Sequence, residues 1–132
     1  MKFCVMCLFA ILALRCGPAP VESVPLSQEF DLKVGHQTMV HGEDLFITFS
    51  RLAEEGRCPE GVLCLWEGNA RIQIRAEKGG VGITEAPLNT TLDPKHILFA
   101  GYDITMKKLS PYPKYGQPVD TLAYVATLLV TK

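Results

Sequence analysis

The segment GRCPEGVLCLWEGNARIQIRAEKGG, which spans Gly56–Gly80, combines two closely spaced cysteines with the most regular strand pattern of the chain. In its second half, small and aliphatic residues alternate with polar and charged ones until a glycine pair ends the pattern. A period of two is typical of a β-strand with one buried face, and paired glycines are typical of a turn. We therefore expect a strand here whose buried face consists of Ala70, Ile72, Ile74 and Ala76.

Similar short patterns recur from Gln28 to the end of the chain, separated by residues that favour turns. They predict a single domain over residues 28–132 with about seven short strands, and an all-β fold that is an antiparallel β-sandwich or an open barrel. Two weaker elements are expected inside it. Residues 50–57 are compatible with a short helix, and the strand over 81–89 is expected to break at Pro87 because proline donates no ladder hydrogen bond.

The segment TLAYVATLLVTK at the C-terminus has apolar residues on both faces of the expected strand. A strand that is apolar on both sides is usually central in its sheet, so the chain end should be fixed in the core. The more regular face is formed by Leu122, Tyr124, Ala126, Leu128 and Val130.

Composition excludes several classes of protein. The 132 residues are 48% hydrophobic and 20% charged, which argues against a disordered chain. The formal net charge is −1 and there is no block of basic residues. We therefore expect no nucleic-acid partner and no polybasic membrane contact.

The N-terminus has the pattern of an export signal. Lys2 precedes an apolar run over Phe3–Leu14, which is too short to span a bilayer and has the length of a signal peptide, residues 1–15. Residues 16–27 are rich in Pro, Gly and Ser and predict a flexible tether. The segment LALRC resembles the lipobox of bacterial lipoproteins, with Cys16 as the lipidated residue and Arg15 where a small residue is favoured. The prediction is a membrane-anchored lipoprotein of a bacterial cell envelope, with simple secretion as the alternative.

The cysteines of the mature chain predict one disulfide. Of five cysteines, Cys4 and Cys7 belong to the signal peptide and Cys16 is the lipid candidate. Cys58 and Cys64 remain as an even pair in an exported protein, which is read as a disulfide. The spacing is not that of a CxxC redox pair, and no other Cys or His lies near this loop to complete a metal site.

The disulfide-closed ring has two interpretations. In the first it is architectural, and Trp66 covers the bridge as part of a small structural staple. In the second a rigid loop inserts into the cleft of a hydrolase such as a protease, because preorganisation lowers the cost of binding. The candidate binding loop consists of Arg57, Pro59, Glu60, Val62, Leu63, Trp66 and Glu67.

A second candidate surface lies in LSPYPKYGQPVD, Leu109–Asp120, where Tyr112 and Tyr115 are flanked by prolines. Exposed tyrosines in a stiff segment suit contact with a protein or a glycan of the cell envelope. The alternative is a plain crossover connection whose tyrosines cover a sheet edge. We leave both open at this point.

Catalytic and metal-binding patterns are sparse. The sequence has no GxSxG, no HExxH and no phosphate-binding glycine loop, so we expect a binding domain rather than an enzyme, and no cofactor. A weak metal candidate is the group His41, Glu43 and Asp44, which is close together in sequence and carries suitable ligand atoms.

The segment RCPEGVLCLWEGNA also resembles the signature of a family of small exported bacterial proteins, many of them lipoproteins, with the pattern SRCPxxVxCxWxGxA. Gly56 stands where that family more often has Ser. GYDITMKKLSPYP and YVATLLV resemble it too, so the likeness covers most of the chain after the tether. The resemblance implies export and implies no activity, since the family is mostly uncharacterised. The matching residues are Arg57, Cys58, Pro59, Val62, Cys64, Trp66, Gly68 and Ala70.

Overall fold

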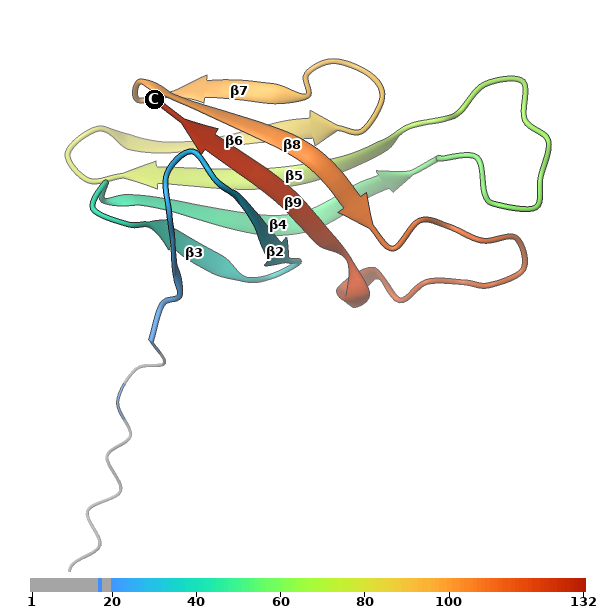
Figure 1. Ribbon diagram of the computed structural model, residues 1–132, viewed down its shortest axis with the longest axis horizontal. Helices are drawn as coiled ribbons and strands as arrows, with labels where there is room; N and C mark the ends of the chain where they lie inside the picture. The colour runs from blue at the N-terminus through green and yellow to red at the C-terminus, as the bar shows by residue number, and fades with distance from the viewer. Residues whose placement is uncertain (1–16, 18–19) are drawn as a thin grey trace, which may run out of the picture.

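The computed structural model describes Gly17 and residues 20–132 (Figure 1). The expected signal peptide, residues 1–15, and the lipidation candidate Cys16 lie outside the described residues. The described part of the chain is an open sandwich of two β-sheets, which confirms the all-β fold. No helix in this part is long and apolar enough to cross a membrane.

Nine strands are present in the described residues, rather than about seven. The first sheet has the order β1-β3-β4-β5-β6, and the second has the order β2-β9-β8-β7. Neighbouring strands are antiparallel except for β1 and β3, which are parallel. The bounds are β1 Ser23–Val24, β2 Glu29–Lys33, β3 Gln37–Val40, β4 Leu45–Glu55, β5 Ala70–Lys78, β6 Gly82–Asn89, β7 His96–Phe99, β8 Tyr102–Ser110 and β9 Val125–Thr131.

The strand that was clearest in the sequence, β5, lies between β4 and β6. Its predicted inner face is confirmed, since Ala70, Ile72, Ile74 and Ala76 have no exposed surface. The opposite wall of the core comes from the second sheet, in which Ile104, Leu128 and Val130 are equally buried. The core is thus formed by the two inner faces of the sandwich, as alternation predicts.

The last strand is central, as expected, because β9 lies between β2 and β8. Tyr124 immediately before it is buried, and so are the three inward residues of the strand that were predicted. Leu122 is an exception. It belongs to the 3₁₀ turn η1, Thr121–Ala123, and is exposed, because the Asp120 carboxylate accepts a hydrogen bond from the Leu122 N–H and ends the extended pattern.

Two local expectations are wrong. Residues 50–55 continue strand β4 instead of forming a helix, and register shifts at Phe49/Arg51 and Leu52/Glu54 explain why their alternation is lost. Strand β6 runs through Pro87 without a break. Because β6 is the edge of its sheet, the missing proline N–H can face away from its only neighbour.

One prediction follows from the core. Ile72→Glu places a carboxylate in a fully buried position, and we expect it to abolish cooperative folding, since burying an unpaired charge costs more than the stability of a domain of this size. Gln73→Glu is the matched control on the outer face of the same strand, with an expected change of about 0.5 kcal/mol or less. Circular dichroism during urea unfolding measures both. A folded Ile72→Glu protein with native stability contradicts the assignment of this face to the core.

Candidate functional site

Two long loops meet at one end of the sandwich (Figure 1). The first, residues 56–69, connects β4 to β5, and the second, residues 111–124, connects β8 to β9. Backbone hydrogen bonds join them, from the Glu60 N–H to the Pro113 carbonyl at 3.0 Å and from the Tyr115 N–H to the Glu60 carbonyl at 2.9 Å. The two candidate surfaces of the sequence are therefore one structural unit.

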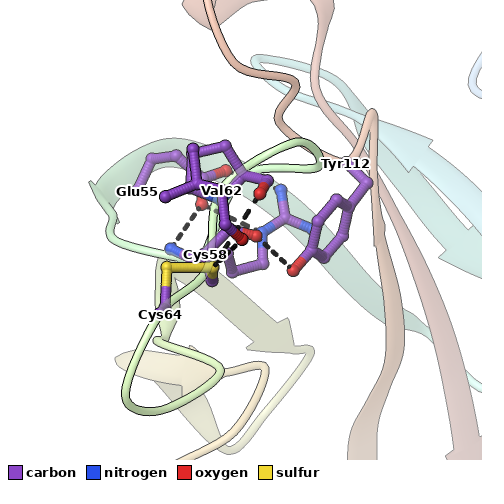
Figure 2. Close-up of a disulfide and its surroundings, with 7 residues drawn as sticks. Glu55, Cys58, Val62, Cys64 and Tyr112 are labelled. Atoms are coloured by element: carbon purple, nitrogen blue, oxygen red, sulfur yellow. Dashed lines mark hydrogen bonds and ion pairs between the residues drawn. A yellow bond between two sulfur atoms is a disulfide. The ribbon is translucent and has the colours of Figure 1, made fainter.

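The disulfide between Cys58 and Cys64 is present, with the two Cα atoms 6.0 Å apart (Figure 2). A turn inside the ring is closed by the Val62 N–H, which donates to the Pro59 carbonyl at 3.3 Å. The Cys58 sulfur lies 3.5 Å from the Val62 carbonyl oxygen, but a disulfide sulfur carries no proton, so this is a packing contact. The predicted ring is confirmed.

Arg57 is the buried centre of this unit, with a side chain only 6% exposed. Its guanidinium donates to both carboxylate oxygens of Glu55, at 2.9 and 2.5 Å. It also donates to the carbonyls of Leu109 at 2.8 Å and Pro111 at 2.9 Å. The structure thus places Arg57 inside the junction between the loops, where it joins the end of β4 to the end of β8.

Glu55 is held in its ionised form by this arrangement. Burial raises its pKa, but the hydrogen bonds and the positive charge of Arg57 outweigh burial and hold the pKa below its ordinary value. Tyr124 donates to the same carboxylate at 3.0 Å, and burial together with this bond raises the pKa of Tyr124. Because the folded pKa of Glu55 is depressed, its contribution to stability is present at neutral pH and is lost as the pH falls through that lowered value.

Tyr112 fastens the ring to this centre. Its hydroxyl donates to the Cys58 carbonyl at 2.7 Å (Figure 2). The Arg57 guanidinium carbon lies over the Tyr112 ring, 5.0 Å from the ring centroid. A cation stacked on an aromatic face adds to the hydrogen bond. Tyr112 is therefore mainly structural, whereas Tyr115 is 73% exposed.

The far end of the first loop is fixed by Gly68 and Asn69. Gly68 has φ +76°, and a Cβ at this position would come within 2.0 Å of the Gly56 carbonyl oxygen, so only glycine fits. The buried Asn69 side chain donates to the Asn89 side chain at 2.9 Å. It also accepts from the backbone N–H groups of Thr91 and Leu92, in the loop that follows β6. The path of residues 56–69 is thus held at both ends.

Between these fixed ends the loop exposes apolar side chains. We call Val62, Leu63, Leu65, Trp66 and Tyr115 the apolar tip. Leu63 and Leu65 are fully exposed, at 103% and 107% of the reference area, and Trp66 is 57% exposed. Trp66 lines the same shallow hollow as Cys58 and Cys64, and more than half of its surface stays in solvent. Large apolar side chains that a rigid loop holds in solvent mark a candidate interaction site.

Sequence reasoning missed Leu65, although a signal for it exists. Cys64 must point into the ring to reach Cys58, so the residues on either side of it are directed away from the ring. The other predicted loop residues, Pro59, Glu60 and Glu67, lie around a shallow hollow that the disulfide and Trp66 also line.

A groove of about 280 Å³ lies beside the loop junction and was not predicted. Thr90 and Thr91 line it, together with Lys107 and Lys108 of strand β8. The register shift between Met106 and Lys108 makes Lys107 an extra residue in the strand. The charged residues of its lining are Glu67, Lys107, Lys108 and Arg57, and the last of these is paired with Glu55.

The metal candidate does not assemble. In the described part of the chain, no group of three or more His, Cys, Asp and Glu side chains is arranged to hold a metal ion. Glu43 instead accepts hydrogen bonds from the Tyr102 hydroxyl and from Lys132, and these bonds lower its pKa. Lys132 also lies near the Tyr102 ring. This cluster closes the end of the sandwich opposite the apolar tip.

No family model matches the chain, and comparison with curated proteins and with solved structures found no significant match. The resemblance described for residues 57–70 therefore stays a prediction. The geometry alone supports the site: a disulfide ring whose shape is fixed, a buried arginine that orients it, and a tip of exposed apolar side chains.

The second prediction concerns Arg57. Arg57→Met keeps the volume but leaves the Glu55 carboxylate without its cation, and we expect a loss of about 3–5 kcal/mol in the free energy of unfolding. The matched control is Arg71→Met, whose guanidinium lies 3.6 Å from Glu54 on the surface and whose loss should cost about 1 kcal/mol or less. Urea unfolding at neutral pH measures both. Equal effects for the two variants contradict the central role of Arg57.

Proposed function

We propose that this chain is an exported, lipid-anchored domain of a bacterial cell envelope that binds a partner protein through the apolar tip. The observation that carries the proposal is the full exposure of Leu63 and Leu65 on a loop that a disulfide and a buried arginine hold in place. Exposed leucines on a fixed loop reduce solubility and add nothing to the core, so a partner that covers them gives them a role.

The energetics favour binding by this loop. Covering one leucine contributes about 1.5–3 kcal/mol, and Trp and Tyr are the side chains most often found at the centre of protein interfaces. A mobile loop would lose much of this gain in ordering itself, whereas a loop that is already fixed does not. A small contact area on the tip can therefore give useful binding affinity.

Export and anchoring are supported by the sequence. The apolar run Phe3–Leu14, the LALRC segment and the disulfide all fit an oxidising envelope compartment. In Figure 1 the chain that precedes β1 lies below β3, toward the left, and the two loops project at the right. An anchor at Cys16 would attach the chain ahead of β1, which is not part of the two loops, and would leave the tip free for a partner.

The third prediction tests the tip in cells. A photoreactive benzoylphenylalanine at position 63 should give a discrete cross-linked adduct with one envelope protein. Leu65→Ser should reduce the yield at least about 10-fold by removing the other fully exposed leucine of the tip. The control places the same residue at position 98, because Leu98 is 77% exposed on the edge strand β7, away from the tip. Absence of an adduct at position 63, or the same adducts at both positions, contradicts the proposal.

The fourth prediction tests the anchor. Cys16→Ser should release the protein from the membrane fraction and abolish incorporation of a palmitate analogue, because only the thiol of Cys16 accepts the lipid. Cys7→Ser, inside the predicted signal peptide, should leave both unchanged. Membrane fractionation and metabolic labelling measure the two effects. Continued labelling of the Cys16→Ser protein contradicts lipidation at this residue.

A further inference from the structure

The three residues Leu63, Cys64 and Leu65 combine exposed side chains with a free backbone. None of the described residues forms a backbone hydrogen bond with the N–H or carbonyl groups of these three positions. Cys64 is directed into the ring and both leucines are directed to solvent. A partner that covers this segment must therefore supply hydrogen bonds as well as apolar contact.

This requirement distinguishes a lipid bilayer from a protein cleft as the partner of the tip. A lipid bilayer accepts leucine, tryptophan and tyrosine but offers no partners for an open peptide backbone, so inserting this segment in hydrocarbon is costly. Glu60 and Glu67, which flank the tip, also oppose insertion. A protein cleft that binds peptides by backbone pairing, and that takes their side chains in pockets, satisfies both demands.

We propose that the apolar tip is an inhibitory loop for a serine peptidase with an apolar primary pocket, and that Leu63 fills that pocket. The inference rests on the proposed function, because it names the partner class of the same site. The active-site cleft of such a peptidase binds a peptide backbone on both sides of the scissile bond and places one large apolar side chain in its pocket.

The position of the disulfide selects Leu63 over Leu65. The bond between Leu63 and Cys64 lies inside the ring, so its cleavage leaves two chain ends that the disulfide still joins. The bond after Leu65 lies outside the ring and has no such link. Of the two fully exposed leucines, only Leu63 therefore lies at a bond whose cleavage leaves both chain ends attached to the protein.

The chemistry of this step balances within the complex. The serine oxygen of the peptidase bonds to the carbonyl carbon of Leu63 as the bond to the Cys64 nitrogen breaks. The serine proton passes through the general base of the peptidase to that nitrogen, which becomes the amino group of Cys64. Because the disulfide holds this amine beside the ester, reversal competes with hydrolysis and the peptidase stays occupied.

The surrounding contacts keep the segment in position during binding. The Cys58 carbonyl accepts from the Tyr112 hydroxyl at 2.7 Å, and the Cys58 N–H donates to the Glu67 carbonyl at 2.8 Å. Glu60 is paired with the second loop through Lys114 and its neighbours. A loop held from both sides loses little conformational freedom on entering a cleft, which favours tight binding over ordinary cleavage.

The experiment uses the full chain, exported by a bacterial host and recovered with its disulfide intact, and purified peptidases as probes. Chymotrypsin and subtilisin, which accept large apolar residues, should be inhibited at near-stoichiometric concentration, and trypsin should not. Leu63→Lys should weaken inhibition of chymotrypsin at least about 100-fold, because it places a charge in an apolar pocket, and should create inhibition of trypsin. Leu98→Ser is the matched control and should behave as the unchanged protein.

Other outcomes overturn the inference. It fails if neither chymotrypsin nor subtilisin is inhibited, if Leu63→Lys does not inhibit trypsin, or if the loop is simply digested. It also fails if the protein without its lipid, Cys16→Ser, sediments with neutral phosphatidylcholine vesicles through the tip. The cross-link at position 63 distinguishes failure of the peptidase assignment from failure of the proposed function. If the cross-link forms but no peptidase is inhibited, only the peptidase assignment fails. If the cross-link is absent, the proposed function fails as well.

Discussion

The buried guanidinium of Arg57 determines how the two sheets meet at the functional end of the molecule. It accepts no hydrogen bond and must donate several, and the partners it finds are the Glu55 carboxylate at the end of β4 and carbonyls at the end of β8. One side chain therefore connects the first sheet to the second. Because a buried ion without its partner is strongly unfavourable, the charge pair and the path of both loops depend on each other.

The disulfide and the arginine act on different properties of the loop. Closing so short a ring contributes only about 2 kcal/mol by the chain-entropy argument, but it fixes the shape of residues 58–64. The arginine, through Tyr112 and the second loop, fixes the direction in which that shape points. Either one alone would leave the apolar tip free to turn or to collapse onto the sheet. Together they keep two leucines in water, where hydrophobicity alone would not place them.

The strands were predictable where alternation is local and regular, as in β5 and β9. Prediction failed where a distant neighbour decides the outcome. Pro87 is tolerated because β6 has a partner on one side only, and residues 50–55 stay extended because β5 pairs with them across two bulges. The cysteine pair was readable from composition and spacing. The role of Arg57 was not, since the carbonyl groups to which it donates lie more than 50 residues away. Leu65 was overlooked because its direction is set by the residue beside it.

Trp66 has a practical consequence, since it is the only tryptophan in the chain and it lies on the apolar tip rather than in the core. The intrinsic fluorescence of this protein is therefore dominated by a single indole outside the hydrophobic interior. Its emission reports on the local polarity around the loop and not on the packing between the sheets. An optical titration of this protein consequently observes the contact surface directly, without a label, while global unfolding is best followed by far-ultraviolet dichroism.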